Sequence, residues 1–166
     1  ANNVAAGLAG RGVRPGDFVL IHLGNCPEFL VAWFACSQLG AVAVTTNTRS
    51  SPEELAYFAA NCQAVAAITQ PALLAAVRGS SQRFRFIACT RTDLGAPAAA
   101  PIDAGVLDFE ALKGDPAAVP VRPAEPLARN SVQYTSGTTS RPKGVVWTHA
   151  NALWGAKLGA TLLQLT

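Results

Sequence analysis

Short apolar runs alternate with helical patterns along the first half of the chain, and this alternation constrains the fold more than any other feature. The strand-like runs are bounded by turn residues and lie at residues 18–23, 41–45, 64–69 and 84–89. Helical patterns precede and separate them at residues 1–10, 25–39, from 51 onward and at 71–78. Strands connected by helices of this length pair in parallel, and both faces of such a sheet are covered. The sequence therefore predicts an α/β fold with a mostly parallel sheet flanked by helices and joined by right-handed crossovers.

Residues typical of helix ends support these boundaries. Asn25 is expected to cap the second helix, whose first turn accommodates Pro27, and Gly40 is expected to end it. The sequence Ser51-Pro52-Glu53-Glu54 matches a capping box, in which the serine hydroxyl and the last carboxylate each accept from the other residue's backbone N–H. Thr148 is placed to cap a final helix.

Residues 90–130 differ from the rest because they are rich in Pro, Ala, Gly and Asp, with only a short helical pattern at 109–112. We interpret them as a surface connection between an α/β subdomain, residues 1–89, and a hairpin with its following helix, residues 131–166. The chain contains no methionine, opens inside a helical pattern and closes without a helix stop signal. We therefore expect residues 1–166 to be an incomplete N-terminal part of a larger domain.

Composition excludes several classes of protein. Half of the residues are hydrophobic and 14% are charged, which excludes a disordered chain. The net charge is only +3, and the densest basic group, at residues 78–91, has four arginines. We favour an ordinary solvated edge for that group and expect no nucleic-acid partner.

The chain is also expected to lack a transmembrane segment. Residues 29–48 carry no charge and are long enough to cross a bilayer, but Ser37, Gln38 and Gly40 interrupt the run, so a buried helix leading into a buried strand explains it better. The four cysteines form no C-x-x-C pair, and we interpret them as buried free thiols. Free thiols suggest a reducing compartment, hence a cytoplasmic protein.

The most informative segment is YTSGTTSRPKG, residues 134–144. Four hydroxyl side chains and Gly137 fall within residues 135–139, and Lys143 follows Pro142. Such a loop offers backbone N–H groups, hydroxyl donors and one positive charge to a single anion. Glycine permits the backbone angles that turn N–H groups inward and leaves room for phosphate oxygens. The segment therefore suits the phosphate tail of a nucleoside triphosphate.

Two other nucleotide motifs do not fit. A Walker A loop counted from Gly137 requires glycine where Pro142 stands and Ser or Thr where Gly144 stands, and it opens a helix, whereas this segment leads into a strand pattern. A dinucleotide fingerprint counted from Gly10 meets Pro15 at its third glycine position and follows a helix instead of a strand.

The segment resembles the signature [ST]-S-G-[ST]-T-G-x-P-K-G of adenylate-forming enzymes, which include acyl-CoA synthetases, luciferases and the adenylation domains of peptide synthetases. Nine of ten positions fit, and Ser140 stands where the family usually has glycine. The matching residues are Thr135, Ser136, Gly137, Thr138, Thr139, Arg141, Pro142, Lys143 and Gly144. Upstream, residues 11–64 resemble the family's usual opening. The stretch SGTTSRPKGVVWTHAN is most similar to the crotonobetaine/carnitine-CoA ligase group.

The resemblance implies ATP and Mg²⁺ as cofactors and CoA as the acceptor of an acyl group from a small-molecule carboxylic acid. Ser136 to Thr139 and Lys143 would hold the β- and γ-phosphates, with Thr138 or Thr139 near the metal. Arg141 either contacts phosphate or is solvated, and Ser140 is expected to alter loop mobility or nucleotide affinity.

The family's ribose-binding aspartate and catalytic lysine come later in its sequences. The resemblance therefore implies that this chain contains no catalytic residue and is inactive alone. Two alternatives remain open: an amino-acid-adenylating domain of a peptide synthetase, and a nucleotide-binding module without chemistry.

The remaining histidines and tryptophans have simpler interpretations. His149 either supports the nucleotide or begins a helix by bonding to backbone, and we favour the second. His22 is expected to be a core or loop residue with its hydrogen bonds made. Packing in an apolar core is the default expectation for Trp33, Trp147 and Trp154.

Overall fold

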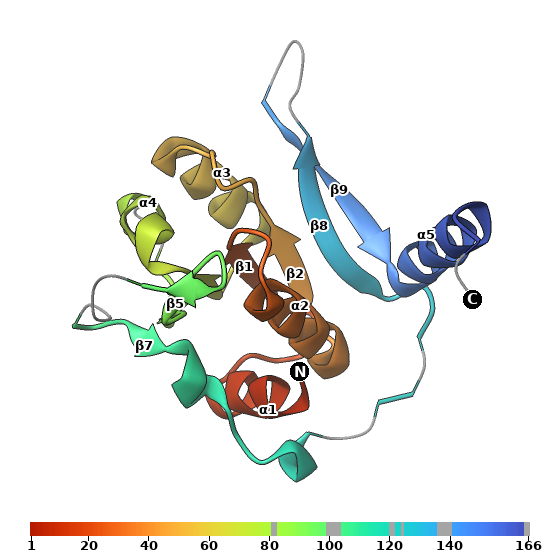
Figure 1. Ribbon diagram of the computed structural model, residues 1–166, viewed down its shortest axis with the longest axis horizontal. Coiled ribbons are helices and arrows are strands. Elements are labelled where there is room, and N and C mark those ends of the chain that lie inside the picture. Colours follow the sequence, from red (N-terminus) through yellow and green to blue (C-terminus); the bar gives the residue numbers. More distant parts are fainter. Residues whose placement is uncertain (81–82, 99–103, 120–121, 124, 136–140, 165–166) are drawn as a thin grey trace.

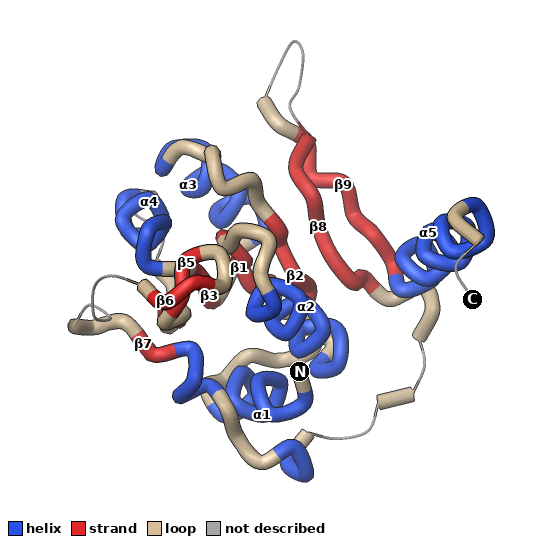
Figure 2. Tube along the Cα trace, in the orientation of Figure 1, coloured by secondary structure: helices blue, strands red, loops and turns tan. Residues whose placement is uncertain are grey.

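The computed structural model describes residues 1–80, 83–98, 104–119, 122–123, 125–135 and 141–164. Within them, one seven-stranded sheet has the order β7-β4-β3-β1-β2-β8-β9 (Figures 1 and 2). Its strands are β1 (Phe18–His22), β2 (Val42–Thr45), β3 (Ala66–Thr69), β4 (Ile87–Cys89), β7 (Leu107–Asp108), β8 (Arg129–Thr135) and β9 (Lys143–Thr148). Neighbouring strands are parallel, except that β8 and β9 form an antiparallel hairpin. The predicted, mostly parallel sheet is confirmed.

Helices cover both faces of this sheet. They are α1 (Asn2–Gly10), α2 (Pro27–Leu39), α3 (Pro52–Cys62), α4 (Leu74–Gly79) and α5 (His149–Leu162), with 3₁₀ turns η1 (Pro71–Leu73), η2 (Phe109–Leu112) and η3 (Pro116–Ala118). A small separate hairpin joins β5 (Thr92–Asp93) to β6 (Ala96–Pro97). α1 packs with α2, and α3 packs with α4.

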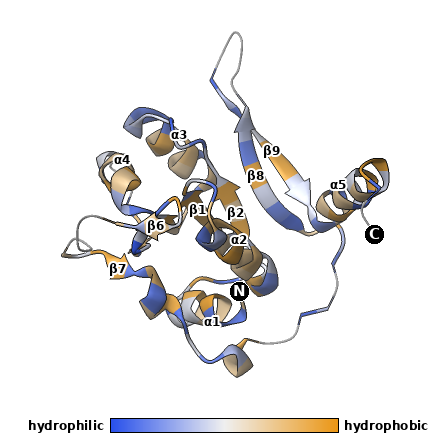
Figure 3. Cartoon of the chain, in the orientation of Figure 1, coloured by the Kyte–Doolittle hydropathy of each residue, from blue (hydrophilic) through white to orange (hydrophobic). Residues whose placement is uncertain are grey.

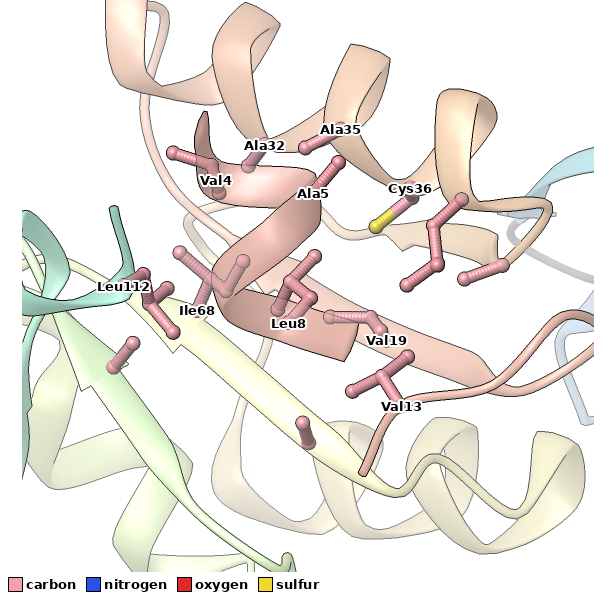
Figure 4. Packing of buried hydrophobic residues seen from close by; sticks show 14 of the residues in the cluster. Val4, Ala5, Leu8, Val13, Val19, Ala32, Ala35, Cys36, Ile68 and Leu112 are labelled. Carbon is pink, nitrogen blue, oxygen red and sulfur yellow. The ribbon is translucent and has the colours of Figure 1, made fainter. Parts of the chain in front are cut away.

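The core has two parts, one on each face of the sheet, and successive strand residues enter them alternately. Val19 and Ile21 of β1 lie in the cluster that includes α1, α2 and η2, whereas Leu20 lies in the cluster that includes α3. All three side chains are fully buried. Figure 4 shows the first cluster, where Leu8 of α1 lies close to Val19. Burial on both faces explains why the strands read as continuous apolar runs.

The helix ends agree with the sequence except at one position. The capping box is present: the Ser51 hydroxyl accepts from the Glu54 amide at 3.2 Å, and the Glu54 carboxylate accepts from the Ser51 amide at 2.9 Å. Gly40 ends α2 with a φ of +78°. The prediction that Asn25 caps α2 is wrong, because the extended residue before Pro27 is Cys26, and no side-chain cap bond is made there. Thr148 caps α5 as predicted.

Residues 107–112 correct the interpretation of a surface connection. β7 pairs with β4 and extends the sheet. Phe109 and Leu112, which follow it, are 3% and 0% exposed and pack with α1. Asn3 and Gly114 also bond to each other twice, through the Asn3 carbonyl at 2.8 Å and the Asn3 side-chain amide at 3.2 Å. Residues 107–112 contain little regular secondary structure, but they supply part of the core.

Two of the three tryptophans are more exposed than expected. Trp154 is 68% and Trp147 38% exposed, and α5 buries none of its described residues. Figure 3 shows apolar residues on this helix, which stands at one side of the molecule. Trp33 is partly buried and donates its indole N–H to Asn130 Oδ1 at 3.1 Å.

The four cysteines carry thiols and form no disulfide, as expected, but only Cys36 and Cys89 are buried, whereas Cys26 and Cys62 are partly buried. Burial raises the pKa of the Cys36 thiol to about 12 and that of Cys62 to about 11, so both are neutral near pH 7. Among the described helices, none combines the length and apolarity needed to cross a membrane.

Candidate nucleotide-phosphate site

The hairpin of β8 and β9 carries the glycine- and hydroxyl-rich segment at its turn. Thr135 at the end of β8 pairs with Lys143 at the start of β9, and Tyr134 pairs with Gly144. Because β8 is parallel to β2, with Gln133 beside Thr45, the Thr135–Lys143 pair lies at the end of the sheet where β2 also ends. Ligands of open α/β sheets bind outside the carboxyl ends of the strands, so Thr135 and Lys143 lie at the edge where a ligand is expected.

The predicted phosphate-binding residues divide into two groups. Residues 136–140, which include both candidate magnesium ligands, Thr138 and Thr139, lie outside the described residues. Thr135, Arg141, Pro142, Lys143 and Gly144 form the described base of the loop. Thr135, Arg141 and Lys143 are exposed.

Packing favours glycine at position 144, in addition to any role of this residue in binding. A Cβ atom there would lie 3.1 Å from Val132 Cγ1 and 3.3 Å from the Tyr134 ring, which is closer than ordinary van der Waals contact. A small residue at this position therefore lets the Tyr134 ring lie against the hairpin, next to the base of the loop.

A cleft of about 330 Å³ lies between the base of the loop and the connection from β2 to α3. Its lining is mostly polar and uncharged, and its charged residues are Arg49 and Glu54. The Glu54 carboxylate already accepts the Ser51 amide in the capping box. Arg49, together with the exposed Arg141 and Lys143 on the hairpin, therefore favours an anion in or beside the cleft.

The residues of the β2–α3 connection were not predicted to be part of this site. Those that line the cleft are Thr46, Asn47, Arg49 and Ser50, and the last residue of β2, Thr45, lines it as well. One signal could have found them: they follow a predicted strand of a parallel sheet, at its carboxyl end.

Helix α3 contacts strand β8 and the residue that precedes β9. The Tyr134 hydroxyl of β8 donates to Asn61 Oδ1 at 2.7 Å and lies 3.3 Å from the Phe58 carbonyl oxygen. The Tyr134 ring stacks on Phe58 with centroids 4.2 Å apart. From the other side, the Tyr57 hydroxyl donates to the Pro142 carbonyl oxygen at 3.0 Å. Burial raises the pKa of Tyr134 well above its usual value, so this phenol remains a hydrogen-bond donor.

His149 lies at the opposite end of the hairpin from the loop. It follows Thr148, which pairs with Arg129 at the start of β8, whereas Lys143 marks the loop end. A strand of six residues spans roughly 20 Å, so a supporting role beside the phosphates does not fit. The favoured interpretation holds for the backbone, since the His149 amide donates to the Ala128 carbonyl. The ring lies 3.3 Å from Asn130 Nδ2 and 3.5 Å from Ser37 Oγ.

His22 is a core residue with one of its two ring nitrogens paired. Nδ1 lies 2.9 Å from Thr46 Oγ1, and the Thr46 hydroxyl donates to the Ile21 carbonyl oxygen. The hydroxyl has a single proton, so the ring donates from Nδ1. Nε2 is buried and has no partner within the described part of the chain. The expectation that this histidine makes both of its hydrogen bonds is therefore wrong.

The stability of the fold is expected to fall between pH 6.5 and 4 because of His22. Burial lowers the pKa of the ring from 6.5 to about 4, so in this interval the unfolded chain binds a proton that the folded chain does not. The stability that the neutral His22 ring contributes is complete above pH 6.5. At pH 4, roughly 3 kcal/mol of the free energy of unfolding has been lost. Urea unfolding at several pH values should show a shallower decline for His22→Gln than for the wild type. Equally steep declines in the two proteins would contradict the lowered pKa of His22.

The fold and the site together define a class: a mostly parallel α/β protein with a β-hairpin that carries cationic side chains at the carboxyl edge of its sheet. A family model described as "AMP-binding enzyme" matches residues 1–164. The chain belongs to this family of AMP-binding enzymes.

Individual relatives agree with this assignment. The crotonobetaine/carnitine–CoA ligase of Escherichia coli O139:H28 is 39% identical over 148 residues, which cover 84% of this chain and 27% of that protein. The chain therefore spans about a quarter of the length of this curated relative.

Solved structures share the fold over nearly the whole chain. An anthranilate CoA ligase, AuaEII, in complex with anthranoyl-AMP has a TM-score of 0.80 and 28% identity, covering 95% of this chain and 30% of the other. Apo MbtA from Mycobacterium smegmatis has a TM-score of 0.77 and 29% identity, covering 99% and 30%.

Proposed function

We propose that the protein containing this chain is an AMP-forming acid–CoA ligase. In the first half-reaction, the carboxylate oxygen of a small acid attacks the α-phosphorus of ATP, and pyrophosphate leaves as acyl-AMP forms. In the second, the CoA sulfur attacks the acyl carbon, loses its proton and releases AMP. The observation that carries the proposal is the position of the signature hairpin, with Lys143 at its base, at the carboxyl edge beside a cleft that favours anions.

The residues of this chain would bind and orient the nucleotide. Lys143 would place a positive charge next to the phosphates, while the hydroxyl and N–H groups of residues 135–139 would donate to phosphate oxygens. Thr138 or Thr139 would lie near Mg²⁺, which supplies neutralising charge for the leaving pyrophosphate when bound. Holding the triphosphate in one orientation is the main contribution that such a loop makes to in-line transfer.

An assay of ATP–pyrophosphate exchange on two chains tests the proposal. One is the 166-residue chain, and the other is a chain extended to the length of its curated relatives, which we call the full-length chain. The full-length chain is expected to incorporate labelled pyrophosphate into ATP only when a suitable acid is present. The 166-residue chain is expected to show no exchange, because it spans about a quarter of the relative's length. Crotonobetaine and carnitine begin the panel of acids, followed by aromatic acids and amino acids.

The possible outcomes separate the alternatives. Exchange with amino acids alone would favour an amino-acid-adenylating domain. Nucleotide binding without exchange by the full-length chain, across the whole panel, would favour a binding module. Exchange catalysed by the isolated 166-residue chain would contradict the expectation that it is inactive.

A further inference from the structure

Helix α3 is not part of the β8–β9 hairpin, but it bonds to residues on both sides of the phosphate loop. On the β8 side, Tyr134 is the residue before Thr135, and its hydroxyl bonds to Asn61 of α3 at 2.7 Å. On the β9 side, Pro142 is the residue before Lys143, and its carbonyl accepts the Tyr57 hydroxyl of α3 at 3.0 Å. Helix α3 therefore bonds to the hairpin on both sides of the Thr135–Lys143 pair: Tyr134 lies one residue toward the sheet, and Pro142 lies one residue toward the loop.

The β8–β9 ladder extends as far as the Thr135–Lys143 pair, so Pro142 lies just beyond the described ladder. The Thr135 hydroxyl adds a contact at the limit of a hydrogen bond, 3.5 Å from the Lys143 carbonyl oxygen. The Arg141 guanidinium lies 5.7 Å from the centre of the Tyr57 ring, which is cation–π distance. The Tyr57 side chain thus contacts the segment before β9 twice, through its hydroxyl at Pro142 and through its ring at Arg141.

α3 is suited to act as a fixed support. Its first turn is closed by the capping box, and its inner face buries Leu55, Phe58 and Ala59 in the core. A hydroxyl fixed to such a helix can hold a carbonyl of the loop base with little motion, because the ring packs against Phe58 and Tyr134 with centroids 5.9 and 6.1 Å away.

We propose that Tyr57 is a positioning residue for nucleotide binding: its hydroxyl fixes the Pro142 carbonyl and thereby the backbone from which Lys143 reaches the triphosphate. This inference rests on the proposed function of the loop. The contribution of Tyr57 is indirect, since it sets the position of Lys143 while the charge of Lys143 contacts the phosphates. Small displacements of such supporting groups weaken binding more than they weaken the fold.

Tyr57→Phe in the full-length chain tests the proposal, because phenylalanine keeps the ring and its contact with Arg141 but removes the bond to Pro142. The KM for ATP is expected to rise about 5- to 10-fold, corresponding to one lost hydrogen bond, while the KM for the acid stays the same. Hydrogen–deuterium exchange of the peptide spanning residues 141–144 should become faster in the nucleotide-free protein. The urea midpoint should change little, since Pro142 is partly exposed and its carbonyl can accept from water once the hydroxyl is gone.

Ser80→Ala is the matched control, because it also removes one hydroxyl bond, which the Ser80 hydroxyl donates to the Val77 carbonyl oxygen at 2.6 Å, but at the end of α4 and outside the lining of the cleft. It should lower the urea midpoint through loss of a buried hydrogen bond and leave the KM for ATP unchanged. If Tyr57→Phe behaves in the same way as Ser80→Ala, Tyr57 is merely structural and the proposal is overturned.

Lys143→Ala in the same series separates this proposal from the proposed function. If Lys143→Ala raises the KM for ATP and Tyr57→Phe leaves it at the wild-type value, the positioning role of Tyr57 is wrong and the loop assignment stands. If Lys143→Ala has no effect, the loop does not bind the phosphates as proposed, and the positioning role is lost with it.

Discussion

Lys143→Ala is expected to lower kcat/KM for ATP in the full-length chain by about 10²- to 10³-fold, the usual effect of removing one preorganised group that stabilises developing charge. Lys143 is exposed at the first position of β9, where its side chain is free to approach a ligand of the hairpin turn. Removing its ammonium group takes a charge-assisted hydrogen bond from the triphosphate. Initial rates of acid-dependent pyrophosphate release, measured against ATP concentration, give the ratio directly.

Lys157→Ala is the control for this prediction, because it removes the same charge from the exposed helix α5, fourteen residues further along the chain. It should leave kcat/KM within a factor of two, roughly the scatter of a distant surface change. Lys143→Arg should recover part of the loss, since it keeps the charge but changes the donor geometry. Equal effects of Lys143→Ala and Lys157→Ala would show that net charge, and not a specific contact, governs ATP binding.

The layout of the sheet could be predicted because its strands are buried on both faces. Continuous apolar runs such as Val19 to Ile21 arise when successive side chains enter different cores, and caps such as Ser51 and Gly40 mark the helix ends. The core residues of 107–112 were missed because they fall in a strand of two residues and a 3₁₀ turn. Neither element is long enough to show a period.

The loop of the candidate site could be predicted, whereas its support could not. The signature is contiguous in sequence, so Lys143 and Gly144 were identifiable without knowing the fold. The contact of Tyr57 with Pro142 joins residues 85 positions apart, and it depends on α3 lying beside the β8–β9 hairpin. His149 shows the converse case: it is close to the loop in sequence but separated from it by the whole length of β9.

Gly7→Ala is expected to destabilise the chain by about 3 kcal/mol or more, which is at the upper end for overpacking a core. A Cβ atom on Gly7 would overlap the Leu112 carbonyl oxygen. Backbone must move to relieve this contact, and η2 is attached to the sheet through β7 and to α1 through the buried Leu112 side chain. Helix propensity acts in the opposite direction, since alanine favours a helix over glycine by about 1 kcal/mol. Any loss of stability therefore comes from packing.

Gly10→Ala supplies the matched control on the same helix, because a Cβ atom there meets nothing within 4 Å. This change should be neutral or stabilise the chain by up to about 1 kcal/mol, through helix propensity and a less flexible unfolded state. Urea unfolding should thus show a large loss of stability for Gly7→Ala and no loss for Gly10→Ala, although the substitution and the helix are the same. If Gly7→Ala were as stable as Gly10→Ala, η2 would not rest on α1, and the buried part of residues 107–112 would have to pack elsewhere.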